Sequence, residues 1–151
     1  MIEMRKIEKK DSKLLNQFLE TKDINKKFIE NNFNSTVIMI ESNKIIGLSV
    51  YKTIDKLTGI ISYIGYNKDF LTPEYKDGFF RSILNVMLRN GLFYCIILTN
   101  KNNYNFYKKY NFDSLSKNKK YIKYIKINDN IAKGYKVNIQ KFFNRPCSSN
   151  K

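Results

Sequence analysis

The stretch "TPEYKDGFFRSILNVMLRNG", Thr72 to Gly91, is the clearest guide to the fold of this chain. From Asp77 onward, apolar residues recur every three or four positions, which is the spacing of the buried face of an α-helix. These residues are Phe79, Phe80, Ile83, Leu84, Met87 and Leu88. Gly91 stands where a glycine often follows a helix, because glycine adopts left-handed backbone angles without strain. The stretch therefore predicts a tight loop that runs into a helix near Asp77, with the helix ending just before Gly91.

Length and composition predict one folded domain. The chain has 151 residues, of which 42% are apolar and 15% aromatic, enough to pack a core. No apolar run approaches the ~20 residues that a membrane span needs, and "MIEMRKIEKK" lacks the apolar core of a secretion signal. The two cysteines, Cys95 and Cys147, are too far apart in sequence to suggest a disulfide framework. We expect a soluble cytoplasmic protein without a membrane partner.

The sequence contains no histidine. This absence excludes histidine general bases, Ser-His-Asp triads and zinc sites built on imidazole. We expect no bound metal.

The positive charge is concentrated at the C-terminal end. Residues 101–151 carry 13 Lys and Arg against 2 Asp and Glu, whereas residues 1–100 carry 15 against 11, and the net charge is +15. A basic face can attract nucleic acid, acidic lipid or an anionic cofactor. The excess is nearly all lysine and accompanies many Asn, Ile, Tyr and Phe residues, as AT-rich codons would produce, and we favour this compositional explanation.

The first half of the chain predicts alternating strands and helices. "MIEMRKI" at 1–7 is typical of a strand, and "DSKLLNQFLE" at 11–20 of a helix capped by Asp11 or Ser12. A weaker helical pattern follows at 23–33. Residues 35–53 hold two β-rich runs around the polar turn Glu41-Ser42-Asn43-Lys44, and "TGIISYIGY" at 58–66 adds a third strand of an antiparallel meander.

The second half continues the alternation. "LFYCIILTN" at 92–100 is a continuous apolar run, typical of a strand covered on both faces. A short helix is expected within 102–112, ending near Asn111, and a strand at 121–128. "KGYKVNIQKFF" at 133–143 fits a strand or a helix. We therefore expect one domain at 1–127 and an extension at 128–151 that packs on the domain or is partly disordered.

Two short motifs accompany this order of elements: "LTPEYKDGFFRSIL" at 71–84 and "NKNNYNFYKKYNF" at 100–112. Together, over residues 1–127, they resemble the GNAT superfamily of acyl-CoA-dependent N-acetyltransferases. The resemblance implies an α/β fold in which a mixed, mostly antiparallel sheet of six to seven strands is flanked by about four helices. It also implies acetyl-CoA as co-substrate.

The first motif resembles the family's phosphate-binding segment, in which R/Q-x-x-G-x-G/A opens a helix. Pro73, Glu74 and Tyr75 match, and Lys76 takes the basic position, but Phe79 and Arg81 replace the two glycines. Glycines let backbone amides approach a pyrophosphate closely at a helix N-terminus, so the side chains at 79 and 81 should narrow that approach. The residues that the resemblance assigns to the cofactor are Leu71, Lys76, Asp77, Gly78, Phe79, Phe80, Arg81, Asn100 and Tyr107.

Two interpretations of that segment stay open. Asp77 could cap the helix and place a carboxylate where a phosphate would lie. Alternatively, Lys76 and Arg81 could contact the phosphate through their side chains. In either case we expect weaker affinity for CoA than is usual for the fold.

The second motif resembles the family pattern N-x(6)-Y-x(4)-F, matched by Asn100, Tyr107 and Phe112. By resemblance, Asn100 would hydrogen-bond the acyl-CoA or the strand ends, and Tyr107 would be the general acid that protonates the departing thiolate. The alternative for Tyr107 is a packing residue. Asn111 replaces the usual glycine, and asparagine tolerates left-handed angles.

The family stabilises the oxyanion with a main-chain amide of the fourth strand, which here would lie near Gly65 or in 67–71. Candidate bases are Asp69, Glu74 and Glu41. The expected function is acetyl transfer to a primary amine of a small molecule, a peptide or a charged transfer RNA, by a monomer or homodimer. The alternative is a catalytically impaired GNAT-like binding or regulatory module with weak or no CoA binding.

Overall fold

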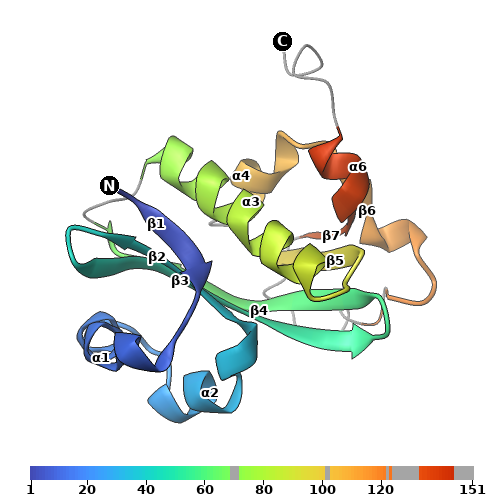
Figure 1. Cartoon of the computed structure of the whole chain (residues 1–151). Helices are drawn as coiled ribbons and strands as arrows, with labels where there is room; N and C mark the ends of the chain where they lie inside the picture. The colour runs from blue at the N-terminus through green and yellow to red at the C-terminus, as the bar shows by residue number, and fades with distance from the viewer. Residues whose placement is uncertain (69–71, 101–102, 122, 124–132, 145–151) are drawn as a thin grey trace. The chain divides into compact units, whose positions relative to one another are not determined.

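The computed structural model describes residues 1–68, 72–100, 103–121, 123 and 133–144. Its sheet has seven strands in the order β1-β2-β3-β4-β5-β7-β6 (Figure 1). The strands are β1 (Glu3–Lys6), β2 (Thr36–Glu41), β3 (Lys44–Asp55), β4 (Thr58–Tyr66), β5 (Tyr94–Thr99), β6 (Asp113–Ser114) and β7 (Lys133–Asn138). The α-helices of the described residues are α1 (Ser12–Leu19), α2 (Lys26–Asn31), α3 (Pro73–Arg89), α4 (Tyr104–Lys108) and α6 (Ile139–Phe143). The mixed α/β fold is confirmed, with one helix more than expected.

The chain divides into two compact units. Unit 1 comprises Met1–Lys52 and Ile61–Asn90, and unit 2 comprises Thr53–Ile60 and Gly91–Lys151. In the described part of the chain, no helix is long and apolar enough to cross a membrane.

Unit 1 contains the predicted hairpin. β2 pairs antiparallel with β1 and with β3, for example Glu3 with Ile40 and Thr36 with Val50. The turn residues Ser42 and Asn43 have φ angles of 51° and 61°, the positive angles that a two-residue turn of the I′ type requires. The prediction of a hairpin at this turn is confirmed.

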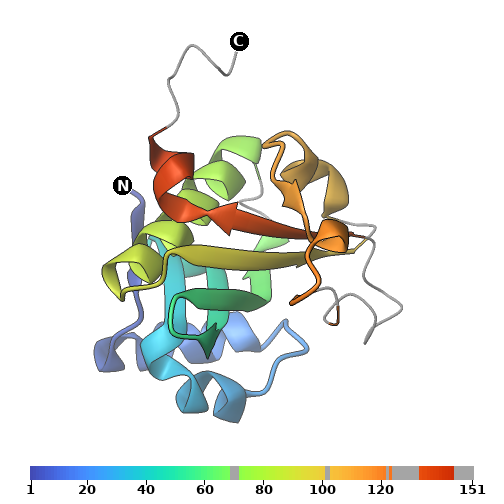
Figure 2. The same ribbon diagram turned by 90° about the vertical axis from the view of Figure 1, so that its right-hand side faces the viewer.

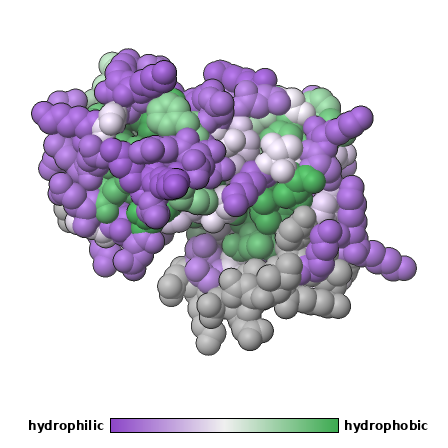
Figure 3. Space-filling model, turned by 90° about the horizontal axis from the view of Figure 1, so that it is seen from below, coloured by the Kyte–Doolittle hydropathy of each residue, from purple (hydrophilic) through white to green (hydrophobic). Residues whose placement is uncertain are grey.

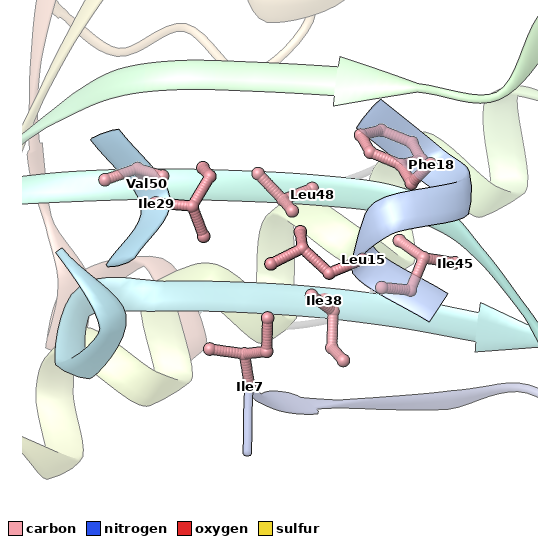
Figure 4. Packing of buried hydrophobic residues seen from close by; sticks show 8 residues of the cluster. All are labelled: Ile7, Leu15, Phe18, Ile29, Ile38, Ile45, Leu48 and Val50. Carbon is pink, nitrogen blue, oxygen red and sulfur yellow. The ribbon is translucent and has the colours of Figure 1, made fainter. Parts of the chain in front are cut away.

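Helices cover both faces of the unit 1 strands: α1 and α2 lie on one side and α3 on the other (Figure 1). The core under α1 and α2 joins Leu15 and Phe18 of α1 to Ile29 of α2 and to Ile38 and Leu48 of the strands (Figure 4). Viewed from the side of α1 and α2, hydrophilic side chains cover most of the outer surface of these helices (Figure 3). Burial of the apolar stripe is therefore what holds these short helices in place.

Asp11 has a different role from the predicted one. It occupies the position before α1, but its side chain makes no capping bond to that helix. Instead, its carboxylate accepts two hydrogen bonds from the Arg5 guanidinium, at 2.7 and 2.8 Å, and one from the Glu8 amide at 2.7 Å. Asp11 is only 3% exposed, so this ion pair stabilises β1 against the start of α1 from within the fold.

α3 begins four residues before the predicted start. Thr72 is its N-cap and accepts from the Tyr75 amide, Pro73 is the first helical residue, and Asp77 lies inside the helix. The prediction of Asp77 as a cap was wrong, because the first turn of α3 is too exposed to show apolar periodicity. The predicted end is confirmed: the helix stops at Arg89 and Gly91 has a φ angle of +85°.

In unit 2, β5 is central. It pairs in parallel with the first residues of β4, Thr58 with Tyr94 and Ile60 with Ile96, and antiparallel with β7, Tyr94 with Asn138 (Figure 2). Its residues 95–97 are buried, so side chains on both faces of this strand are covered, as the continuous apolar run predicted.

The extension expected from residue 128 contributes to this sheet. Residues 133–143 fitted a strand or a helix, and they form both: β7 and then α6. β7 pairs with β5 on one side and β6 on the other. Of the strand expected at 121–128, Tyr121 lies in a turn and residues 122 and 124–128 lie outside the described residues, as does Cys147.

Candidate functional site

The expected site residues fall into two groups, one in each unit. Lys76, Asp77, Gly78, Phe79, Phe80 and Arg81 all lie in the first half of α3, in unit 1. Asn100 and Tyr107 follow β5 and lie in α4, in unit 2. Leu71 and Asp69 lie outside the described residues.

The backbone of the first motif forms a helix and not an open loop. Pro73 has no N–H, the Tyr75 amide donates to Thr72 Oγ1 at 3.2 Å, and the Lys76 amide donates to the Thr72 carbonyl at 3.1 Å. From residue 77 onward, an α-helix directs each amide to the carbonyl four residues earlier. The amides of residues 77–81 are therefore engaged in the helix, which overturns the expected loop at these positions.

Phe79 and Phe80 belong to the core. Both side chains are fully buried, and the Phe79 ring meets the Tyr66 ring edge to face with the centroids 6.0 Å apart. A Cβ added at Gly47 would lie 3.2 Å from the same Phe79 ring, so glycine makes room for it on β3. The expectation that Phe79 would narrow a phosphate site was wrong, because its ring points into the protein.

Gly78 has a packing role in this structure. A Cβ at this position would lie 3.2 Å from the terminal methyl of Met4, so the glycine allows α3 to lie close to β1. Its position in the helix is thus explained without a ligand.

Besides Glu74, three charged side chains lie in this half of α3: Lys76, Asp77 and Arg81. Arg81 Nε donates to Asp77 Oδ2 at 2.9 Å, an ion pair one helical turn apart. Lys76 Nζ lies 5.8 Å from the centroid of the Tyr66 ring, within range of a cation–π contact. Burial holds the pKa of the Tyr66 phenol well above its usual range, so this ring stays neutral. Lys76 and Arg81 are the cations that the segment can offer to an anion.

The end of β4 was expected to free a main-chain amide. The Asn67 amide donates to the Ile46 carbonyl at 2.8 Å, so within 67–71 this amide is engaged, and residues 69–71 lie outside the description. A Cβ at Gly65 would meet the Tyr63 hydroxyl at 2.2 Å, so glycine lets the Tyr63 side chain lie along the strand.

Of the candidate bases, Glu74 is exposed and Glu41 accepts a hydrogen bond from the Tyr75 hydroxyl at 2.9 Å. That hydrogen bond raises the pKa of Tyr75. Neither carboxylate is thereby singled out as the base.

A hollow of about 450 Å³ opens in unit 1 beside the end of β4. Its apolar part comes from Leu14, Phe18 and Ile45, and its polar part from Gln17, Glu20, Thr21, Lys44 and Asn67. Sequence reasoning missed it because its residues come from α1, the start of β3 and the segment after β4, which only folding brings together.

Asn100 organises the start of α4 in unit 2. Its Oδ1 accepts from the Asn103 amide at 3.1 Å, and Asn103 Oδ1 accepts in return from the Asn100 amide at 2.8 Å. The Asn100 carbonyl also accepts from the Tyr104 amide. These bonds connect the residue that follows β5 to the N-terminal end of α4, the helix that carries Tyr107.

Tyr107 is 2% exposed and lies among aromatic rings. Its ring meets Phe106 edge to face at 4.9 Å, and Tyr110 stacks on Phe112 at 5.1 Å. Asn111 has a φ angle of 55°, the left-handed angle expected from its match to a family glycine. Tyr107 is thus a buried side chain of α4 that packs against an aromatic neighbour.

No family model matches the sequence, and no curated protein matches it. Solved structures do match. An N-acetyltransferase from Staphylococcus aureus Mu50 has a TM-score of 0.68 at 17% identity, covering 93% of this chain and 99% of that one. A second protein from the same strain, an acetyltransferase of the GNAT family, has a TM-score of 0.67 at 12% identity, covering 92% and 99%. The chain has the GNAT fold.

Other matches to the GNAT fold were crystallised with coenzyme A. The PaiA N-acetyltransferase from Thermoplasma acidophilum, in complex with coenzyme A, has a TM-score of 0.60 at 12% identity, covering 91% of this chain and 99% of that one. N-acetylglutamate synthase from Neisseria gonorrhoeae, in complex with coenzyme A and N-acetyl-glutamate, has a TM-score of 0.70 at 13% identity. This chain is 92% covered in that match but spans only 35% of the synthase.

The two motifs of this chain differ in how closely they follow the pattern expected of the GNAT family. The second motif keeps Asn100 and Tyr107 in a well-fixed turn and helix. The first motif is part of α3. The sequence Thr-Pro-Glu already marked the start of this helix, because a polar cap residue followed by proline at the first helical position is typical of a helix N-terminus. Within the described residues, no group of His, Cys, Asp and Glu side chains is arranged to hold a metal ion.

Proposed function

We propose that the protein transfers an acetyl group from acetyl-CoA to a primary amine. The observation that carries the proposal is the GNAT fold over more than nine tenths of the chain, shared with proteins crystallised with coenzyme A. The retained Asn100 and Tyr107 support it.

Tyr107 is assigned as the general acid. The neutral amine attacks the thioester carbonyl, and its nitrogen then loses a proton to water. The C–S bond of the tetrahedral intermediate breaks, the sulfur leaves as the thiolate of CoA and takes the Tyr107 phenol proton, and solvent returns a proton to the phenolate. A phenol pKa of about 10 lies just above that of a thiol, so proton transfer can accompany cleavage. Asn100 positions this residue by fixing the start of α4.

Lys76 and Arg81 are assigned as side-chain contacts to the phosphates of CoA. The helix supplies few amides for this purpose, because Thr72 already accepts from the Tyr75 and Lys76 amides. Cationic side chains alone give weaker and more salt-dependent binding than a backbone cradle. Affinity for acetyl-CoA is expected to be low for the fold.

The occupied amides of α3 favour a second candidate function, a GNAT-like module that binds or regulates a partner with weak or no CoA binding. It makes a different prediction, since such a module would release no CoA thiol in the presence of amines, whether or not it binds acetyl-CoA weakly.

The acceptor is proposed as a primary amine on a small molecule, a peptide or a charged transfer RNA. The hollow beside the end of β4 is the first place to seek it, because Glu20 offers a carboxylate to an ammonium group beside the apolar Phe18 and Ile45. We keep a monomer or homodimer as the expected assembly. The catalytic domain is proposed to extend beyond the expected residues 1–127, because β7 pairs with β5 inside the sheet.

The proposal is tested first by calorimetric titration with acetyl-CoA, then by thiol release in the presence of polyamines, amino sugars and peptides. Tyr107→Phe should lower kcat by about 10² while leaving acetyl-CoA affinity unchanged. Tyr104→Phe is the matched control, because it removes a hydroxyl from the same helix, and it should change kcat less than about threefold. Equal losses in both variants would make Tyr107 a packing residue.

The phosphate assignment has its own control. Lys76→Gln/Arg81→Gln should weaken acetyl-CoA binding by about tenfold, whereas Lys13→Gln/Lys27→Gln removes the same charge from exposed positions of unit 1 and should leave it nearly unchanged. Absence of acetyl-CoA binding by the unaltered protein would support the second candidate instead.

A further inference from the structure

Unit 2 carries a basic hollow that the proposed acetyl transfer does not use. Two adjoining depressions of about 450 and 600 Å³ share the lining residues Phe112, Asp113, Lys136, Asn138 and Lys141. These residues come from β6, β7 and the start of α6 together with the residue before β6. We call this surface the Lys136 hollow.

The Lys136 hollow lies in the strongly charged part of the chain. Unit 2 contains 14 Lys and Arg against 3 Asp and Glu, whereas unit 1 contains 14 against 10. A coding bias can set the number of lysines, but it does not explain why carboxylates are so much scarcer in one unit. The field of unit 2 should attract anions from solution.

Lysines near the hollow are associated with aromatic rings. Lys136 Nζ lies 4.3 Å from the Tyr94 ring centroid and 5.2 Å from that of Tyr121. Lys109 Nζ lies 4.6 Å from the centroid of the Phe106 ring, and Lys133 Nζ lies 5.5 Å from that of the Tyr135 ring. A ring face orients an ammonium group without neutralising it, so the charge stays available to an anion.

Two asparagine side chains that line the hollow, Asn118 and Asn138, also favour an anionic ligand. Asn118 Oδ1 accepts from the Lys120 and Tyr121 amides, and Asn138 Oδ1 accepts from the Lys141 amide. With the oxygens engaged in local turns, the NH₂ ends are the groups that can face a ligand. Donors from two asparagines and two lysines suit phosphate oxygens and base carbonyls, with Asp113 as the opposing acid in the lining.

One exposed ring lies next to these residues along the chain. Phe143 is 38% exposed at the end of α6 and contacts Phe142, a lining residue, at 5.4 Å between centroids. An exposed ring beside a basic surface is a platform on which a planar group such as a base can stack.

We propose that the Lys136 hollow and the exposed Phe143 ring bind single-stranded nucleic acid. Single strands combine a phosphate backbone for the lysines with unstacked bases for Phe143, and the larger depression has room for a nucleotide. A duplex hides its bases from such rings, which is why a single strand is favoured. The inference does not rest on acetyl transfer, because no residue assigned to catalysis or to CoA takes part.

The test is fluorescence anisotropy of a short labelled oligo(U) RNA with the full-length protein, from about 50 to 200 mM salt. Affinity should fall steeply with salt, and the matching duplex should bind several-fold more weakly. Lys136→Gln/Lys141→Gln should weaken oligo(U) binding by about tenfold and reduce the slope of log affinity against log salt by about 1 to 1.5. The Lys13→Gln/Lys27→Gln variant, with the same net charge, should change binding less than about twofold.

Two further variants separate stacking and charge from folding. Phe143→Leu keeps an apolar side chain but removes the ring face, and should weaken binding at least about fivefold with an unchanged circular dichroism melt. Asp113→Asn should strengthen binding modestly, because it removes the acid from the lining. The proposal is overturned if both lysine pairs have equal effects, if Phe143→Leu binds as well as the unaltered protein, or if anionic lipid vesicles bind and RNA does not.

Discussion

Units 1 and 2 balance their positive charge in different ways. In unit 1, Arg5 is paired with the buried Asp11 and Arg81 with Asp77. In unit 2, Lys109, Lys133 and Lys136 lie over aromatic rings, and Lys120 pairs with Asp55 at 3.2 Å. Lysines lie over aromatic rings in both units, for example Lys76 over Tyr66, but unit 1 has 10 Asp and Glu for its 14 Lys and Arg, whereas unit 2 has 3 for 14. Unit 2 therefore carries the larger excess of positive charge, at the cost of repulsion within the unit.

The largest expected effect comes from breaking the internal pair of unit 1. Asp11→Asn should lower the free energy of unfolding by about 2 to 3 kcal/mol, because the Arg5 guanidinium loses a buried carboxylate that accepts two of its hydrogen bonds. Urea denaturation at neutral pH measures the change. A loss below about 0.5 kcal/mol would show that this pair is no stronger than one on the surface.

The same pair predicts a pH dependence. The Arg5 hydrogen bonds hold the pKa of Asp11 below its usual value. The contribution of Asp11 to the free energy of unfolding is therefore complete above the unfolded-state pKa of about 3.9, and it is lost as the pH falls towards the lower pKa of the folded state. The stability difference between the protein and Asp11→Asn should therefore be constant above about pH 5 and shrink below about pH 4. A difference that grows in acid would contradict the pairing.

An intermediate effect on stability is expected at Asp55, a carboxylate of unit 2. The Tyr121 hydroxyl donates to Asp55 at 2.6 Å and is the main reason that the pKa of Asp55 lies well below its usual range. Tyr121→Phe should lower the free energy of unfolding by about 1 kcal/mol and raise the pKa of Asp55. Denaturation and NMR titration of the carboxyl carbon measure the two effects, and an unchanged Asp55 pKa would show that Tyr121 is not the main cause of the low value.

The smallest effects distinguish the two kinds of cation. Arg81→Gln should cost about 0.3 to 0.5 kcal/mol, the value of an exposed pair one turn apart on a helix. Lys109→Gln should change stability by less than about 0.5 kcal/mol in either direction, because the lost contacts with Phe106 and Tyr110 are offset by weaker repulsion. The comparison between the units fails if Lys109→Gln is the more destabilising change.

Much of the fold could be predicted from sequence where one local rule dominates. Positive angles at Ser42 and Asn43 follow from a polar two-residue turn, and the end of α3 follows from Gly91. The start of α3 was predicted too late, because the exposed first turn has no apolar periodicity. Thr72 before Pro73 was the feature of the sequence that marked the true start. β7 stayed ambiguous because its place depends on pairing with β5, about forty residues earlier along the chain.

The candidate site was less predictable than the fold. The sequence identified the residues of α3 as a segment that matters, but it could not tell that Phe79 points into the core or that Gly78 lies against Met4. Asn100 and Tyr107 were selected by resemblance to the family pattern, and the short helix that contains Tyr107 was predicted. The reciprocal bonds between Asn100 and Asn103 were not anticipated.

The sequence by itself determined the elements whose partners are close along the chain: the hairpin turn, the apolar face of α3 and the left-handed Asn111. Only the tertiary structure decided which side chains met from distant segments, such as Tyr121 with Asp55, or Lys136 with Tyr94. The physical reason is that turns and helices are fixed by backbone angles and neighbouring hydrogen bonds. Long-range partners are fixed by the burial of whole faces, which no short stretch of sequence specifies.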